Sequence, residues 1–262
     1  MAIVLISIYI FALSLIFIYS LGQLNLLLNY RLAQKKADTA QRFDFTKAEE
    51  IPWVTLQLPL YNELYVVERL LEAVAQLDYP KEKLEIQVLD DSTDESLEIT
   101  AQLVQGLKEQ GFLIEQIKRT KRQGFKAGAL REGLAYAKGK FIAIFDADFI
   151  PQANFLKQTV PYFKDPKIGV VQTRWGHTNR DFSVLTKSQA FALDAHFTIE
   201  QVGRNSKNHF INFNGTAGVW RKACINDAGN WQSDTLTEDL DLSYRSQLKG
   251  WQFKYLENVE TP

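Results

Sequence analysis

The sequence predicts an α/β protein in which helices flank a mostly parallel sheet and one membrane-spanning helix precedes it. Three observations lead to this fold class. The stretch from Ala2 to Leu21 has no charged residue and is dominated by Ile, Leu, Phe and Val. From residue 51 onward, apolar runs of strand length alternate with amphipathic stretches of helix length. Acidic clusters follow two of these runs, at the places where the strands should end.

Composition sets bounds on the class of protein. The chain has 262 residues, enough for one α/β domain with an appendage. With 30 Lys and Arg residues against 31 Asp and Glu residues, it lacks the strongly basic balance of a nucleic-acid binder, so we expect no nucleic-acid partner. Its single cysteine, Cys224, excludes an intrachain disulfide. No His or Asn stands near Cys224 in a recognisable motif, which favours a buried small hydrophobe over a nucleophile.

The N-terminal stretch has the length needed to cross a bilayer. About 20 apolar residues span the hydrocarbon core, and the basic residues Arg31, Lys35 and Lys36 follow directly. The positive-inside tendency therefore predicts a single pass over residues 1–30, a linker over 31–50 and a cytoplasmic domain over 51–262. A cleaved signal peptide would need a basic start and a small-residue cleavage site, which this stretch lacks. A buried core helix is the remaining alternative.

The first strands and helices after the linker alternate clearly. The run from Ile51 to Pro59 predicts a buried strand with proline at both ends, and Tyr61 to Glu63 forms a turn into a helix. Glu85 to Leu89 predicts the second strand, followed by a helix to about Glu109. The first of these helices carries an apolar stripe at helical spacing, formed by Val66, Val67, Leu70, Leu71, Val74 and Leu77.

A basic turn follows the third predicted strand, which covers Phe112 to Ile117. The turn runs from Lys118 to Lys126, contains Gly124, and enters a helix that reaches Tyr136. Free N–H groups at a helix start, together with added Lys or Arg side chains, attract phosphate. A solvated basic loop is the alternative interpretation. Because this basic turn lies between two acidic strand ends in the sequence, the phosphate-binding interpretation stays open.

The acidic clusters predict a shared site. Asp90 and Asp91 end the second strand, and Asp146 and Asp148 end the strand over 141–145. Alternation in an extended segment would place Asp146 and Asp148 on one face. Two carboxylates on one face repel unless a cation or a proton lies between them, and Mg²⁺ or Mn²⁺ bridging two phosphates is the usual partner. A helix cap plus a solvated loop acid is the alternative for a lone D-x-D motif.

The later part of the chain changes character. Ile168 to Trp175 predicts another strand, and Asp181 to Gln201 predicts one long helix. The stretch Asn212 to Gly218 is small and polar, as a substrate-lining loop would be. Thr237-Glu238-Asp239 then opens a helix, and Trp251 to Val259 predicts a final strand.

Taken in order, seven segments resemble glycosyltransferase family 2, the inverting transferases with the GT-A fold. The similarity covers about Trp53 to Val259 and is greatest to the cellulose-synthase-like A and C branch, which makes β-1,4-linked mannan, glucomannan or glucan. The matching segments are Leu58-Pro59-Leu60-Tyr61-Asn62-Glu63, Leu89 to Asp94, Gln123 to Leu130, Phe145-Asp146-Ala147-Asp148, Val171 to Trp175, Phe213 to Arg221 and Thr237-Glu238-Asp239.

The resemblance implies a role for each matching position. Asp91 would hydrogen-bond the nucleotide base, and Asp239, beside Glu238, would be the general base on the acceptor hydroxyl. Asp148 would ligate Mg²⁺ or Mn²⁺, with Asp146 near the metal, the ribose and the diphosphate. The remaining implied contacts are to the donor nucleotide, from Tyr61, Glu63 and Lys126, and to the acceptor or sugar, from Gln172, Trp175, Asn214, Gly215 and Thr216.

The tryptophans and histidines could belong either to a functional site or to the core and surface. Trp175, Trp220 and Trp231 would make sugar-stacking platforms or pack in the core, and the core interpretation is favoured for all but Trp175. The three histidines have no metal-ligand spacing, which favours core or surface roles for them.

The function implied is transfer of a hexose from GDP-mannose or UDP-glucose to a growing β-1,4-linked polysaccharide at a membrane. A lipid acceptor, as in enzymes like ceramide glucosyltransferase, is the nearest alternative, and acceptor chemistry separates the two. A second alternative is a non-catalytic protein that only binds a nucleotide sugar. Whether an accessory subunit is needed stays open. An NAD-dependent oxidoreductase would need Gly-x-Gly-x-x-Gly where Pro59 to Glu63 stands. Processive members carry Gln-x-x-Arg-Trp and more membrane helices after this point. We therefore expect the 262 residues to be a C-terminally truncated part rather than a natural short form.

Overall fold

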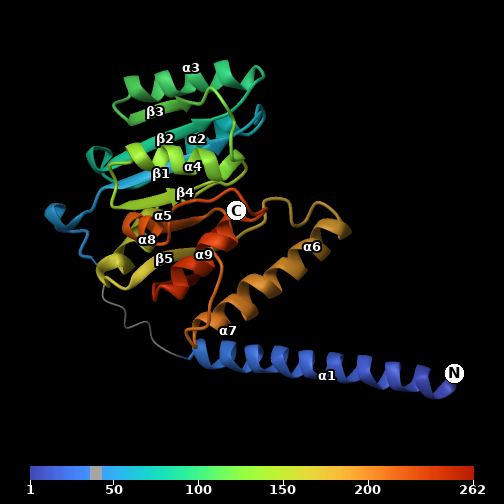
Figure 1. The fold of residues 1–262 in the computed structure, drawn as a ribbon. Helices are drawn as coiled ribbons and strands as arrows, with labels where there is room; N and C mark the ends of the chain where they lie inside the picture. Colours follow the sequence, from blue (N-terminus) through green and yellow to red (C-terminus); the bar gives the residue numbers. More distant parts are fainter. Residues whose placement is uncertain (36–42) are drawn as a thin grey trace. The chain divides into compact units, whose positions relative to one another are not determined.

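The protein, described here as a computed structural model, is defined over residues 1–35 and 43–262, and it divides into two compact units (Figure 1). The helical unit comprises the described part of Met1–Asp38 together with Asn179–His209. The sheet unit comprises the described part of Thr39–Thr178 together with Phe210–Pro262. Asn179–His209 of the helical unit falls within the range 51–262, which the sequence predicted as one domain. Residues 36–42 of the predicted linker lie outside the described residues.

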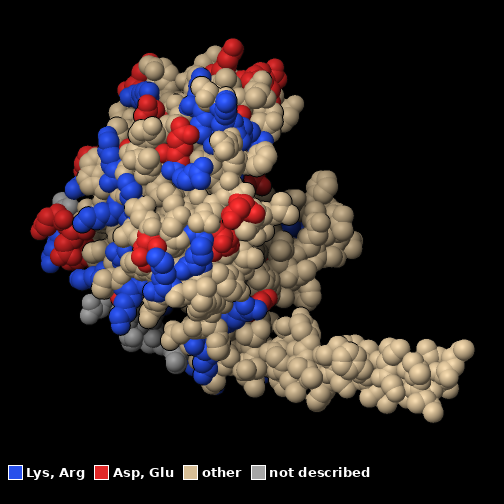
Figure 2. All heavy atoms as spheres, in the orientation of Figure 1, with Lys and Arg blue, Asp and Glu red and all other residues tan. Residues whose placement is uncertain are grey.

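The helical unit is built on α1, Ala2–Ala33, which is long and apolar enough to cross a membrane. Its helix runs three residues beyond the predicted span, and its surface carries no charged side chain over most of its length (Figure 2). A charge-free, mostly apolar helix of this length is therefore a candidate membrane span.

The second part of the helical unit is one continuous helical rod. It comprises α6, Val184–Ala195, a π-helical turn over His196–Glu200, and α7, Gln201–Asn205. The helix predicted over Asp181 to Gln201 therefore begins three residues later and ends four residues later. Ser183 fixes the start with a reciprocal cap, in which its hydroxyl accepts from the Thr186 N–H and its own N–H donates to the Thr186 hydroxyl.

The sheet unit contains seven strands in the order β3-β2-β1-β4-β6-β5-β7. All neighbouring pairs are parallel except those of β6, which is antiparallel to both β4 and β5. The mostly parallel α/β sheet predicted from the sequence is confirmed. The strands are β1 Val54–Leu60, β2 Leu84–Asp90, β3 Leu113–Lys118, β4 Phe141–Ile144, β5 Ile168–Trp175, β6 Gly218–Arg221 and β7 Gln252–Thr261.

Helices cover both faces of this sheet. Their bounds are α2 Val67–Ala75, α3 Ser96–Glu109, α4 Phe125–Tyr136, α5 Phe155–Thr159, α8 Lys222–Asp227 and α9 Glu238–Leu248, with 3-10 turns at Ala48–Glu50, Lys81–Lys83 and Val160–Lys164. The predicted stripe of α2 lies in the core, because Leu70 and Val74 join Leu56 and Leu58 of β1 in one apolar cluster. This burial of apolar surface stabilises the sheet unit.

The opposite face of β1 is polar although it is fully buried. Thr55 donates to the Glu85 carboxylate at 2.6 Å, and Gln57 donates to the Gln87 side-chain oxygen at 3.0 Å, so two cross-strand pairs join β1 to β2. Helix α4 covers these pairs, and Gly133 of α4 lies against Gln57. The sequence predicted a buried strand but not this pairing, because the two polar residues find partners only across the sheet.

The sheet topology brings one edge of the unit together. The carboxyl ends of β1, β2 and β4 meet there because these strands are parallel. Pro59 is accommodated near that end because β4 pairs with β1 only as far as Gln57, so no hydrogen bond on that side is lost. Since β6 is antiparallel, the segment that precedes Gly218 reaches the same edge, opposite Ile144.

Candidate active site

A cavity of about 340 Å³ opens at the carboxyl ends of β1, β2 and β4. Its wall mixes charged and apolar side chains, and it combines the turns after three strands with the start of α4. Six side chains that the sequence singled out for the donor and the metal line this one cavity: Tyr61, Glu63, Asp91, Lys126, Asp146 and Asp148.

The two residues of the first acidic cluster have different surroundings. Asp90 is buried, and its carboxylate accepts hydrogen bonds from the Ser92 N–H and from the Gln116 side-chain amide. It therefore fixes the turn after β2 from beneath and does not line the cavity. Asp91 lines the cavity, and its backbone N–H donates to the Leu60 carbonyl at 3.0 Å. The carboxylate of Asp91 pairs with the guanidinium of Arg119 through two hydrogen bonds.

An aromatic and an arginine lie face to face on the cavity wall. The guanidinium carbon of Arg122 is 3.4 Å from the centroid of the Tyr61 ring, a stacking distance, and the Arg122 Nε is 3.8 Å from the Asp91 carboxylate. The sequence had marked Arg122 only as one member of a basic turn. The signal that it belongs to the cavity was its place between Asp91 and Lys126 in the chain.

Lys126 reaches the cavity from the first turn of α4. Gly124 directly precedes that helix as its N-cap, and its φ of +75° lies in the left-handed region that glycine adopts without strain. The Lys126 ammonium lies 2.5 Å from the Asp146 Oδ1 and donates to the Gly215 carbonyl oxygen at 3.0 Å. One cation therefore joins three segments that are far apart in the sequence.

Asp146 and Asp148 lie in a turn rather than in the extended segment that the sequence predicted. Strand β4 ends at Ile144, and the Phe149 N–H donates to the Asp146 carbonyl at 3.1 Å, which closes the turn. Both carboxylates nevertheless line the cavity, because the turn is tight enough to direct them to the same side. The expected alternation was wrong, since the ladder to β1 stops before Asp146.

Carboxylates crowd this end of the cavity. Burial raises the pKa of Glu63, and the charges of Asp148 and Asp146 raise it further. Burial also raises the pKa of Asp146, while the Lys126 ammonium opposes that rise. A group of carboxylates with one lysine attracts further positive charge.

The carboxylate oxygens available here suit a hard divalent cation that also binds phosphate. Within residues 1–35 and 43–262, no three His, Cys, Asp or Glu side chains form a ready cage for a metal. Mg²⁺ and Mn²⁺ typically take one or two carboxylates and complete their shell with phosphate oxygens and water. Asp148, exposed, and Asp146, half-buried, supply two such carboxylates beside the cavity.

The polar loop before β6 forms another side of the site. Gly215, with a φ of +77°, directs its carbonyl oxygen to Lys126, and a β carbon at this position would lie 3.3 Å from the Asp239 Oδ2. The loop is fixed from below by Gln172, which is fully buried, accepts from the Asn214 N–H and donates to the Thr216 and Ala217 carbonyls.

Thr216 also acts below the surface of the site. It is fully buried, and its hydroxyl accepts from the Asp146 N–H at 2.9 Å. Gln172 and Thr216, expected to line the acceptor, thus position Asn214, Gly215 and Asp146 from below. The sequence correctly predicted a loop here. Only the packing shows which of its residues face the cavity and which lie buried beneath it and hold the loop in place.

The Thr237-Glu238-Asp239 segment brings two further carboxylates. Glu238 is the first residue of α9, and both carboxylates lie half-buried in the helix's first turn. Burial raises the pKa of Glu238, with smaller upward contributions from Asp239 and Asp146 against the lowering effect of Lys126. These interactions place the first turn of α9 within electrostatic reach of Lys126 and Asp146 in the cavity.

The other residues considered from the sequence fall into clear classes. Trp220 and Trp231 are buried and pack against each other with ring centroids 5.6 Å apart, as the core interpretation predicted. Trp175 is half-buried at the end of β5 and packs edge-on against Phe149 at 5.3 Å. Cys224 is buried, and burial raises the pKa of its thiol to about 12, so the prediction of a structural cysteine is confirmed.

Comparison with known protein families gives a match over most of the chain. The family described as "Glycosyltransferase like family 2" matches residues 52–262. A probable glucomannan 4-beta-mannosyltransferase 7 from Oryza sativa subsp. japonica is 44% identical over 215 residues, 80% of this chain and 37% of that protein. Glucomannan 4-beta-mannosyltransferase 1 from Cyamopsis tetragonoloba is 39% identical over 256 residues, 94% of this chain and 49% of that protein. The chain thus spans less than half the length of these relatives.

Solved structures give the same fold. The mannosyltransferase PcManGT from Pyrobaculum calidifontis, in complex with GDP-Man and Mn²⁺, has a TM-score of 0.70 and 25% identity over 90% of this chain and 64% of that one. S. aureus TarS has a TM-score of 0.59 at 17% identity over 80% of this chain and 36% of that one, which shows a likeness of fold alone. The GT-A fold expected from the sequence is confirmed.

Proposed function

This chain belongs to glycosyltransferase family 2, and from that premise we propose that its cavity binds a nucleotide sugar whose hexose is transferred to a growing β-1,4-linked polysaccharide. The donor is GDP-mannose or UDP-glucose. Relatives named as glucomannan mannosyltransferases and the GDP-Man complex of PcManGT support this donor class.

One observation supports the proposal: Lys126 joins the turn after β4 to the loop before β6, which lies next to Asp239. Its ammonium contacts Asp146 and the Gly215 carbonyl, and Gly215 in turn faces Asp239. A diphosphate beside Lys126 would therefore place the transferred sugar next to a carboxylate. A transferase with one displacement step needs this neighbourhood of leaving group and base.

The residues divide the chemistry between them. Asp239 accepts the proton of the acceptor hydroxyl as that oxygen bonds to the anomeric carbon, and the bond from the anomeric carbon to the phosphate oxygen breaks. The nucleoside diphosphate leaves with its electron pair, and the Lys126 ammonium stabilises its charge. Displacement in one step inverts the anomeric centre, which gives a β-linkage from an α-linked donor. Glu238, whose pKa burial raises, is the second candidate for the base.

Asp148 and Asp146 would hold the divalent cation. Mg²⁺ or Mn²⁺ in that position would offset the negative charge of the two phosphates. Among the donor contacts, Asp91 would accept a hydrogen bond from the base, and Tyr61 would pack against it. Glu63 would complete the polar wall near the metal, and Trp175 with Asn214 would face the acceptor sugar.

For the rest of the chain we propose a membrane anchor over residues 1–30 and a linker over 31–50, with the family domain over 51–262 on the cytoplasmic side. The support is the uncharged surface of α1 followed by Arg31 and Lys35. Nucleotide sugars would then reach the cavity from the cytoplasm.

The test compares Asp239→Asn and Glu238→Gln with Asp234→Asn, a control acid in the exposed segment before α9. Release of GDP or UDP is followed with β-1,4-linked oligosaccharides as acceptors, and donor affinity is measured by calorimetry. We expect Asp239→Asn to lose about a hundredfold to ten-thousandfold in turnover, the size of general-base effects, while binding the donor nearly unchanged.

Activity that survives in Asp239→Asn but not in Glu238→Gln would move the base to Glu238. Transfer to a lipid acceptor instead of the oligosaccharide would correct the acceptor class. Donor binding without turnover on either acceptor would support a binding role alone. Absence of nucleotide binding by the wild type would overturn the proposal.

A further inference from the structure

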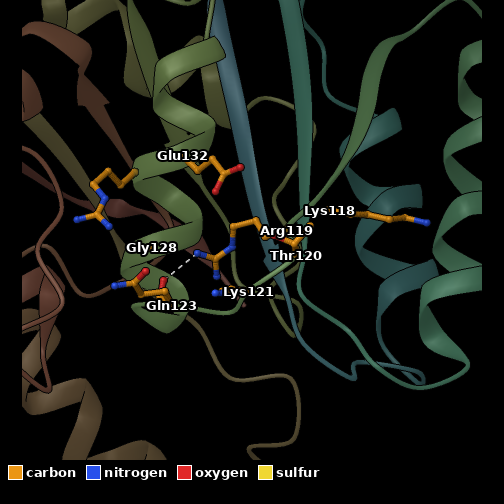
Figure 3. A pocket seen from close by; sticks show the side chains of 8 residues that line it. Lys118, Arg119, Thr120, Lys121, Gln123, Gly128 and Glu132 are labelled. Carbon is orange, nitrogen blue, oxygen red and sulfur yellow. Dashed lines mark hydrogen bonds between the residues drawn. The ribbon is translucent and has the colours of Figure 1, made fainter.

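Arg119 lies between the donor cavity and a second, outer cavity of about 470 Å³. The outer cavity is lined by the turn before α4 and by one side of that helix. Figure 3 shows the Arg119 side chain directed toward Gln123 and Gly128, whereas Lys118, the last residue of β3, points away. Only 6% of the Arg119 side chain is exposed, although it belongs to a basic turn.

The guanidinium of Arg119 is engaged on two sides. Its Nε donates to the Asp91 Oδ1 at 2.8 Å and its Nη2 to the other oxygen, which makes a two-pronged pair with a carboxylate that is itself 6% exposed. On the other side, Nη1 donates to the Gln123 carbonyl and Nη2 to the Phe125 carbonyl, both at 3.0 Å. Lysine has no planar fork with which to make this set of contacts.

The two carbonyls that Arg119 holds belong to the turn that starts α4. Lys126 is the next residue after Phe125, so the position of its ammonium depends on that turn. The packing there is close, because a β carbon at Gly128 would lie 2.0 Å from the Gln123 carbonyl oxygen and 2.6 Å from the Arg119 Nη1. A side chain that fixes both Asp91 and the turn therefore links two separate contact points of the donor cavity.

We infer that Arg119 is a positioning residue for donor binding, which holds the base-side carboxylate of Asp91 and the phosphate-side ammonium of Lys126 in one arrangement. The inference rests on the proposed function of the cavity. Arg119 itself touches no donor atom in this scheme. Its buried fork removes the freedom of two groups that a nucleotide must contact at the same time, so binding costs less conformational entropy.

A double-mutant cycle on nucleotide affinity tests this role. The full 262-residue chain in detergent is prepared as wild type, Arg119→Gln, Lys126→Gln and the double variant, with Arg119→Lys as a milder change. Arg131→Gln is the matched control, because Arg131 also lines the outer cavity but lies on the exposed side of α4. Kd values for GDP and UDP with Mn²⁺ are measured by calorimetry, well below each variant's melting temperature.

We expect Arg119→Gln to weaken binding of the preferred nucleotide about tenfold or more, and Arg119→Lys to fall between it and the wild type. Arg131→Gln should bind like the wild type. The cycle gives the decisive result: Lys126→Gln should cost about tenfold in the wild-type background but only about twofold when Arg119 is already replaced. A merely structural role would lower the melting temperature without this coupling.

Equal affinity of Arg119→Gln and the wild type would overturn the inference, as would strictly multiplicative losses in the double variant. If neither Arg119 variant folds, Arg119 is a folding residue and the inference fails in that way too. A wild type that binds neither GDP nor UDP would instead overturn the proposed function, so the two failures are distinguishable.

Discussion

The ammonium of Lys126 and the carboxylate of Asp146 lie 2.5 Å apart, although 20 residues separate them and they come from different elements of the sheet unit. Each is only partly exposed, with 28% and 33% of the side chain accessible. An ion pair with this much solvent exposure is weak. A diphosphate can therefore replace Asp146 as the partner of Lys126, and a metal ion can replace Lys126 as the partner of Asp146. This relationship is the physical centre of the proposed donor site.

Lys126→Gln should weaken binding of GDP or UDP about tenfold, because a charge-assisted contact to phosphate is replaced by a neutral one. The nucleosides guanosine and uridine, which lack the phosphates, should bind the variant as they bind the wild type. Calorimetry with both ligand types checks this. Lys121→Gln, a change on the same basic turn but outside the donor cavity, is the control. Equal losses for nucleoside and nucleotide would argue against a phosphate contact.

Thr216→Val should destabilise the sheet unit by about 1–3 kcal/mol, since the Asp146 N–H loses its acceptor in a buried place. Thr216→Ser keeps the hydroxyl and should stay closer to the wild type. Chemical denaturation of the three proteins measures the difference. The valine variant should also bind the nucleotide more weakly, because Asp146 is no longer fixed. Identical stability of valine and wild type would exclude this hydrogen bond as a support.

Glu63→Gln should raise the melting temperature at neutral pH without metal, by about 1 °C. The pKa of Glu63 is raised in the folded state by burial and by Asp148 and Asp146, so the native protein binds that proton more tightly than the unfolded chain does. Stability therefore falls as pH rises from about 4 through the raised value, and the loss persists at pH 7. The advantage of the glutamine should shrink as the buffer is taken down toward pH 4.

Thermal scans of both proteins from pH 4 to pH 8 give this comparison. Adding Mn²⁺ with GDP or UDP should also reduce the gap, because bound positive charge relieves the repulsion that the glutamine removes. A gap that is constant across this pH range would mean that Glu63 acts by packing rather than by charge.

Gly203→Leu should disrupt the helical unit. A β carbon at Gly203 would lie 2.7 Å from the Leu26 carbonyl oxygen of α1, so a larger side chain must push α7 away at a cost of about 1–3 kcal/mol. Limited proteolysis in detergent should show faster cleavage within Asn179–His209. Gly22→Ala is the control, because nothing lies within 4 Å of the added carbon there. Unchanged protection of the leucine variant would show that this close contact does not hold α7 on α1.

Much of the fold followed from local sequence patterns. The apolar stripe of α2, the strand over Ile168–Trp175 and the family membership were predicted correctly, since hydrophobic period and motif order are properties of the chain itself. The prediction for Asp146 and Asp148 shows the limit. Alternation assumed an extended backbone, but a strand lasts only as long as its neighbour pairs with it, and β1 stops pairing with β4 at Ile144.

By itself, the sequence determined which residue types are available to the site: the acids after the strands, the lysine at a helix start, the polar loop and the carboxylates of α9. Only the tertiary structure decided their partners. Asp91 faces Arg119, Thr216 supports Asp146, and Gln172 lies beneath the loop instead of on it. The physical reason is that hydrogen bonds and ion pairs between distant segments depend on the order and direction of the strands, and no local pattern encodes that order.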